Sequence, residues 1–183
     1  FDADFIRLLC DMATMPEDED QRVVGSSALF GIVIERLCDD LEEMQADAYN
    51  RTMSLVLSYA RKAPGGEKLD SLLSAFDLRT AQSLFDRAER VREDSYKPRI
   101  WETPPKQVFV LSRVTIGADV AITSVILERL RRLLPEAELV LLGGGKLREL
   151  FGACPGLQIH ELRYPRRGGL LERIHVWSEV LEA

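Results

Sequence analysis

A carboxylate stands at the junction of a predicted strand and a predicted helix, in the segment RVTIGAD that runs from Arg113 to Asp119. The preceding run VFVLS (108–112) is typical of a strand buried on both faces, and Gly117 indicates a loop over 113–118. A carboxylate at the start of the next helix can act as a general base toward a sugar hydroxyl. The same position also suits a cap, in which Asp119 accepts hydrogen bonds from backbone N–H groups. Spacing alone leaves both roles open.

Two other segments carry groups that bind anions. Arg163, Arg166 and Arg167 predict either a clamp for an anionic acceptor or a solvated, charged loop. Gly143–Gly145, followed by Lys146, predicts either a plain turn or a phosphate-binding loop before a helix. The glycine run lacks the spacing of a nucleotide-binding motif, so the turn is the favoured interpretation.

The elements that must position these groups alternate between strand and helix. Pro135 and Pro155-Gly156 separate them, and the helix after Asp119 is expected to turn Ile122, Val125, Ile126 and Leu130 inward. Such alternation implies right-handed crossovers and a parallel, three-layer Rossmann-like sheet. Strands are expected at 108–112, 138–142 and 157–162, and helices at about 119–134, 146–153 and 170–181.

Residues 1–95 instead show helical periodicity throughout, which predicts an all-α amino-terminal module, a helical bundle. The acidic stretch 16–20 and Thr80 are predicted to begin helices, with one long helix reaching about Asn50 and another running from Thr52 to Lys62. Three prolines make 96–107 a linker. The predicted organisation is therefore a helical module (1–95), a proline-rich linker (96–107) and a partial Rossmann-like domain (108–183).

One stripe of the long predicted helix has the spacing of a coiled-coil seam, with alternating steps of four and three residues. It predicts either a core-facing stripe within one bundle or a seam between two copies of the chain. The stripe consists of Phe30, Ile34, Leu37, Leu41, Met44 and Ala48.

Composition excludes several functional classes. The 183 residues carry a net charge of −6, which argues against a nucleic-acid binder. The longest apolar run (23–34) is too short for a membrane span of about 20 residues. Three dispersed cysteines favour a reducing compartment, so the cytoplasm is the expected location. His160 and His175 have no cysteine at metal-ligand spacing and are interpreted as structural or surface residues.

Residues 108–183 resemble the amino-terminal domain of heptosyltransferase-like glycosyltransferases, which have the two-domain GT-B fold. The resemblance rests on VFVLSRVTIGADVAITSV, the later LRRLLPEAELVLL, and FGACPGLQI. Ala118 stands where the family usually has glycine, and Val125 where it usually has proline. The helical residues 1–95 lie outside the family pattern.

The resemblance implies transfer of a heptose-like sugar from a nucleotide-sugar donor, a co-substrate, to a saccharide or glycolipid acceptor. It makes Asp119 the catalytic base and implies no tightly bound cofactor or metal. The net charge leaves no nucleic acid among the expected partners, and the sequence is compatible with peripheral contact with a membrane. Nothing in 1–183 resembles the family's donor-binding domain. The chain begins at Phe1 without an initiator methionine, and its last predicted helix should lead into a fourth strand, so we expect the native chain to extend beyond both ends. The positions assigned to the acceptor are Arg113, Thr115, Gly117, Thr123, Arg166 and Arg167.

The helical module supports a different hypothesis. A bundle with an acidic surface, attached to an inert Rossmann-like scaffold, would make the chain a non-catalytic interaction or oligomerisation protein. Residues 1–50 carry 13 acidic and 3 basic side chains, which gives this alternative its basis.

Overall fold

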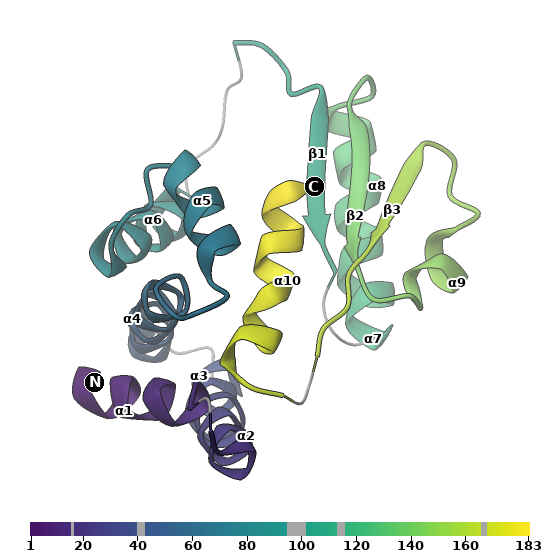
Figure 1. The fold of residues 1–183 in the computed structure, drawn as a ribbon. Coiled ribbons are helices and arrows are strands. Elements are labelled where there is room, and N and C mark those ends of the chain that lie inside the picture. Colours follow the sequence, from purple (N-terminus) through teal and green to yellow (C-terminus); the bar gives the residue numbers. More distant parts are fainter. Residues whose placement is uncertain (16, 40–42, 95–101, 113–115, 166–167) are drawn as a thin grey trace. The chain divides into compact units, whose positions relative to one another are not determined.

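The computed structural model describes residues 1–15, 17–39, 43–94, 102–112, 116–165 and 168–183. They form two compact units: residues 1–98 with 165–182, and residues 99–164 with Ala183 (Figure 1). The first is helical and the second holds a three-stranded parallel sheet. The predicted fold class, a helical region followed by a parallel sheet with interleaved helices, is confirmed.

Side chains begin the helices of the first unit where the sequence predicts. Asp18, in the acidic stretch, accepts a hydrogen bond from the N–H of Gln21 at 2.9 Å, and Thr80 accepts one from the N–H of Ser83 at 3.0 Å. The elements of this helical unit are α1 (Ala3–Ala13), α2 (Glu19–Ser27), the π-helix η1 (Ala28–Ile34), α3 (Glu35–Asp39), α4 (Glu43–Ala60), α5 (Glu67–Ala75), α6 (Ala81–Asp94) and α10 (Leu170–Glu182).

The predicted helix boundary near residue 50 is wrong. Helix α4 runs without a break from Glu43 to Ala60, because none of the residues there is a helix breaker. Arg51 even supports the helix at that point, donating from Nε to Asp47 one turn earlier at 2.7 Å. Of the long helix expected before the boundary, the structure describes η1, α3 to Asp39 and α4 from Glu43, and residues 40–42 lie outside the described residues.

The residues of the stripe predicted over 30–48 differ in burial. Ile34 is buried in the core of the helical unit and Phe30 packs against that core, whereas Met44 on α4 is 77% exposed. Leu41 lies outside the described residues. The first part of the stripe thus faces the core, and a seam between copies remains a prediction.

Helix α10 belongs to the helical core. Leu170 and Ile174 are buried there, α10 packs on α4 and α5, and Lys68 pairs with Glu182 at 2.7 Å. The alternation of elements predicts this helix as part of the Rossmann-like domain (108–183), whereas the structure places it in the helical unit. Of the predicted linker 96–107, residues 96–101 lie outside the described residues, and Gln107 already begins the first strand.

Gly25 permits the close packing of α1 on α2. A Cβ at this position would lie 2.6 Å from Met12 Cβ and 2.7 Å from the backbone nitrogen of Ala13. We therefore expect Gly25→Ala to lower the free energy of unfolding by about 1–3 kcal/mol, measured by urea denaturation. Gly31→Ala is the matched control, because its Cβ would meet only a Glu35 oxygen at 4.0 Å. Equal stability of the two variants would contradict this packing.

The second unit is built on a parallel sheet in the order β1-β2-β3, with β2 in the centre. All three strands lie within one residue of their predicted bounds. Figure 1 shows the helix of residues 124–133 behind this sheet, and Leu127, Leu147 and Phe151 pack on strand residues. The elements of this sheet unit are β1 (Gln107–Leu111), α7 (Ile116–Ala118), the π-helix η2 (Asp119–Thr123), α8 (Ser124–Leu133), β2 (Glu138–Gly143), α9 (Leu147–Phe151) and β3 (Leu157–Glu161).

The predicted inward face of the helix after β1 is wrong at three of its four residues, whereas Leu130 packs against the core of the sheet unit as predicted. Ile122, Val125 and Ile126 are exposed, and the buried stripe is Asp119, Thr123 and Leu127 at steps of four residues. The rotation places a carboxylate and a hydroxyl against the end of the sheet.

None of the helices built from described residues is both long and apolar enough to cross a membrane.

Candidate functional site

The carboxylate of Asp119 is held at the carboxyl end of β1. Its side chain accepts hydrogen bonds from Ser112, whose Oγ lies 2.9 Å from each carboxylate oxygen, and from Thr123, whose Oγ1 lies 2.9 Å from Oδ1. Only 4% of Asp119 is exposed. In open parallel sheets this end of the strands is where ligands bind. Two hydroxyl donors therefore fix the orientation of a buried carboxylate at the expected place.

The backbone around Asp119 is a π-helical turn. The N–H of Ser124 donates to the carbonyl of Asp119, five residues earlier, instead of to a carbonyl four residues earlier. Such turns are rare and occur frequently at functional sites. Because Asp119 and Thr123 are four residues apart, they share the inward face of this turn, which explains their mutual hydrogen bond.

Ser112 reaches Asp119 because the end of β2 comes close to it. The N–H of Ser112 donates to the carbonyl of Leu142 at 2.8 Å, which extends the pairing of β1 with β2 by one residue. A Cβ at Gly143 would lie 2.6 Å from Ser112 Cβ and 3.0 Å from its Oγ. Only glycine at 143 leaves Ser112 in this position, so the first glycine of the run 143–145 supports the carboxylate site.

Tyr164 lies within electrostatic reach of Asp119. Partial burial and the negative charge of Asp119 raise the pKa of its phenol, so the hydroxyl stays protonated at neutral pH. Neither Ser112 nor Tyr164 was predicted to lie near this carboxylate. The signal was available for Ser112, a hydroxyl directly after a predicted strand, whereas Tyr164 follows β3 and is distant from Asp119 in the sequence.

The structure describes only part of the predicted acceptor site. Arg113, Thr115, Arg166 and Arg167 lie outside the described residues. Gly117 is exposed and belongs to the short helix α7 rather than to a loop, because the helical backbone begins at Ile116. Thr123 is 1% exposed and donates its hydroxyl to Asp119, so it belongs to the site as a partner of the carboxylate.

Asp119 does not stand at the start of a helix, as either predicted role assumed. The three residues of helix α7 lie directly before Asp119. Ala118, the residue before η2, makes no side-chain cap bond. The bonds of Asp119 given above run to hydroxyl groups of Ser112 and Thr123. Two hydroxyl donors orient the Asp119 carboxylate at least as well as backbone N–H groups at a helix start would.

The glycine run is a poor phosphate site. A Cβ on Gly145 would lie 2.6 Å from a carboxylate oxygen of Glu161, which places negative charge beside the turn. Helix α9 after the run has only five residues and offers a weak positive end. The structure thus favours the plain turn.

The two histidines are surface residues, as predicted. His160 is exposed on β3, and His175 faces Glu179 on α10 at 3.6 Å. Among the described residues there is no group of three or more His, Cys, Asp or Glu side chains that could hold a metal ion.

Comparison of the chain with models of protein families, with curated proteins and with solved structures finds no match.

Proposed function

We propose that the sheet unit is part of the acceptor-binding side of a glycosyltransferase. It would transfer a heptose-like sugar from a nucleotide-sugar donor to a hydroxyl of a saccharide or glycolipid. The observation that carries the proposal is the buried carboxylate of Asp119, oriented by Ser112 and Thr123 at the carboxyl end of a parallel sheet. The resemblance of residues 108–183 to heptosyltransferase-like enzymes gives the reaction class.

Asp119 is the general base in this proposal. The acceptor hydroxyl displaces the Ser112 hydroxyl from one carboxylate oxygen, while Thr123 continues to hold the carboxylate. As the acceptor oxygen forms its bond to the anomeric carbon of the donor sugar, its proton passes to Asp119. The bond from that carbon to the nucleoside diphosphate breaks, and the diphosphate leaves with the bonding electrons.

Ser112 and Thr123 are positioning residues that act through Asp119. A carboxylate with fixed orientation needs little reorganisation when the proton moves, and that is how a preorganised site lowers a barrier. The protonated phenol of Tyr164 adds a hydrogen-bond donor near the carboxylate, suited to an acceptor oxygen.

The direct test is sugar transfer by the protein purified from its native source. It would be incubated with a panel of nucleotide-linked sugars, heptose among them, with and without saccharide and glycolipid acceptors. We expect release of nucleoside diphosphate that depends on one acceptor, and a gain of one sugar mass on that acceptor. Folded protein that gives no acceptor-dependent release with any donor would overturn the proposal.

A further inference from the structure

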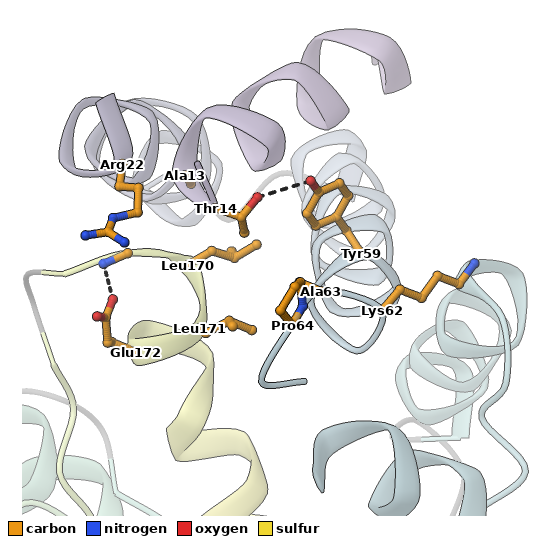
Figure 2. Close-up of a pocket in the computed structure, with 11 residues that line it drawn as sticks. Ala13, Thr14, Arg22, Tyr59, Lys62, Ala63, Pro64, Leu170, Leu171 and Glu172 are labelled. Atoms are coloured by element: carbon orange, nitrogen blue, oxygen red, sulfur yellow. Dashed lines mark hydrogen bonds between the residues drawn. The ribbon is translucent and has the colours of Figure 1, made fainter. Parts of the chain in front are cut away.

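The helical unit contains a pocket of about 620 Å³ where the end of α1, helix α2, the end of α4 and the start of α10 meet (Figure 2). Its volume falls within the range of small-molecule sites, about 300–1,000 Å³. None of its residues belongs to the Asp119 site. The pocket is lined by Ala13, Thr14, Arg22, Tyr59, Lys62, Ala63, Pro64, Gly169, Leu170, Leu171 and Glu172.

Most of the pocket wall is apolar. In Figure 2, Leu170 and Leu171 lie on the α10 side of it, and Ala63 and Pro64 lie across from them after the end of α4. The hydroxyls of Thr14 and Tyr59, 3.1 Å apart, also line the pocket. A ligand that fills this space must therefore bring an apolar body to it.

The two hydroxyls already have partners within the protein. Tyr59 donates to Asp11 at 2.6 Å and Thr14 donates to the carbonyl of Cys10 at 2.9 Å. Desolvation and the bond to Asp11 raise the pKa of the Tyr59 phenol, so this wall is uncharged at neutral pH. These groups do not require a polar ligand.

Arg22 supplies a positive charge at the edge of the pocket. In Figure 2 its side chain extends from α2 toward the start of α10. Among the described residues its guanidinium has neither a hydrogen bond nor an ion pair within reach. The one carboxylate of the lining, Glu172, accepts the N–H of Gly169 instead. Lys62 is also cationic, but its side chain points away from Leu171 and Pro64 in Figure 2.

We propose that this pocket binds a single-chain aliphatic carboxylate, with the acyl chain along Leu170, Leu171 and Pro64 and the carboxylate on Arg22. A guanidinium donates two parallel hydrogen bonds to a carboxylate, and such charge-assisted pairs are strong where an apolar wall excludes water. Glu172 adds negative charge to the same lining, which disfavours a doubly charged phosphate head. The inference is independent of the proposed sugar transfer.

The test is displacement of a fluorescent fatty-acid analogue, dansylated undecanoate, from the folded protein. Dodecanoate below its micelle concentration should displace the probe saturably, and 1-dodecanol should need at least about a tenfold higher concentration, because it lacks the charge. Acetate should not compete. Equal potency of dodecanoate and dodecanol, tighter binding of dodecyl phosphate, or no saturable displacement would each overturn the proposal.

Two variants locate the site. Arg22→Gln should weaken dodecanoate about tenfold or more and leave dodecanol unchanged, since only the charged head loses its partner. Arg36→Gln on α3 makes the same charge change at an exposed arginine outside the pocket and should bind as the wild type does. Ala63→Leu, which fills the apolar side, should weaken both competitors. Wild-type affinity in Arg22→Gln would refute the assignment of the head group.

Discussion

Asp119→Asn is expected to reduce sugar transfer by about 10²–10⁴-fold while the protein stays folded. The amide has nearly the shape of the carboxylate, and its oxygen can still accept the hydroxyl protons of Ser112 and Thr123. It cannot take a proton from an acceptor hydroxyl. The measurement is kcat with the donor and acceptor identified in the transfer assay, beside the thermal unfolding midpoint of each variant.

Three companion variants and one control separate a catalytic from a structural role of Asp119. Ser112→Ala and Thr123→Val each remove one hydroxyl that orients the carboxylate, so we expect about a tenfold loss of kcat, smaller than that of Asp119→Asn. Thr123→Ser restores the hydroxyl and should recover most of that loss. Asp86→Asn, the same chemical change at an exposed position of α6, should leave kcat unchanged.

The contrary result would be an Asp119→Asn protein with wild-type turnover. If its unfolding midpoint fell sharply at the same time, Asp119 would be a structural carboxylate that joins β1 to η2 through Ser112 and Thr123. The sheet unit would then have lost its assigned base, and the proposal of sugar transfer through this residue would fall.

The alternation of strands and helices was predictable because three apolar runs with proline and glycine between them leave few other folds. Strands at 107–111, 138–143 and 157–161 follow the apolar runs that predicted them, such as VFVL and ELVLL. The burial on both faces expected of such runs holds for β2 but is wrong for β1, where Phe109 and Leu111 are exposed. The position of Asp119 at the end of the first strand follows from the same pattern. Local sequence was sufficient for these features.

The rotation of the helix after β1 could not be predicted in the same way. Apolar residues occur on several sides of the segment 119–134, so periodicity favoured Ile122, Val125 and Ile126 as the inward face. The structure instead buries Asp119 and Thr123, because their polar groups bond to each other and to Ser112. Hydrogen bonds compensate the desolvation cost of burying Asp119 and Thr123. One of these bonds comes from Ser112, a residue of another element, so the local sequence does not reveal it.

The place of α10 also depends on contacts far along the chain. Its sequence is amphipathic and suits either the sheet or a helical bundle. Leu170 and Ile174 pack in a core made mainly of residues 6–84, which lie more than 80 positions earlier in the chain. Apolar pattern alone does not distinguish two cores that accept the same face of a helix.

Arg61→Ala is expected to lower the free energy of unfolding by about 2–3 kcal/mol, because several hydrogen bonds to a charged group are lost. Arg61 follows α4 and is only 5% exposed. Its guanidinium donates to Asp70 at 2.5 Å, to Ser74 Oγ at 2.8 Å and to the carbonyl of Leu78. One side chain thus ties the end of α4 to α5 and to the turn that follows α5. Its removal leaves these acceptors without their donor.

A series at this position separates the charge of Arg61 from its geometry. Arg61→Lys keeps the charge, but a compact ammonium group cannot reach the three acceptors that the planar guanidinium of arginine contacts. We therefore expect lysine to recover less than half of the lost free energy of unfolding. Asp70→Asn should cost less than Arg61→Ala, because the Asp70 side chain is half exposed and water can replace part of the pair. Arg79→Ala, at an exposed arginine 3.4 Å from Asp77, is the control and should cost less than about 1 kcal/mol. Urea denaturation of the four variants would measure this order. Equal losses for Arg61→Ala and Arg79→Ala would mean that the buried guanidinium contributes no more to the helical unit than a surface charge does.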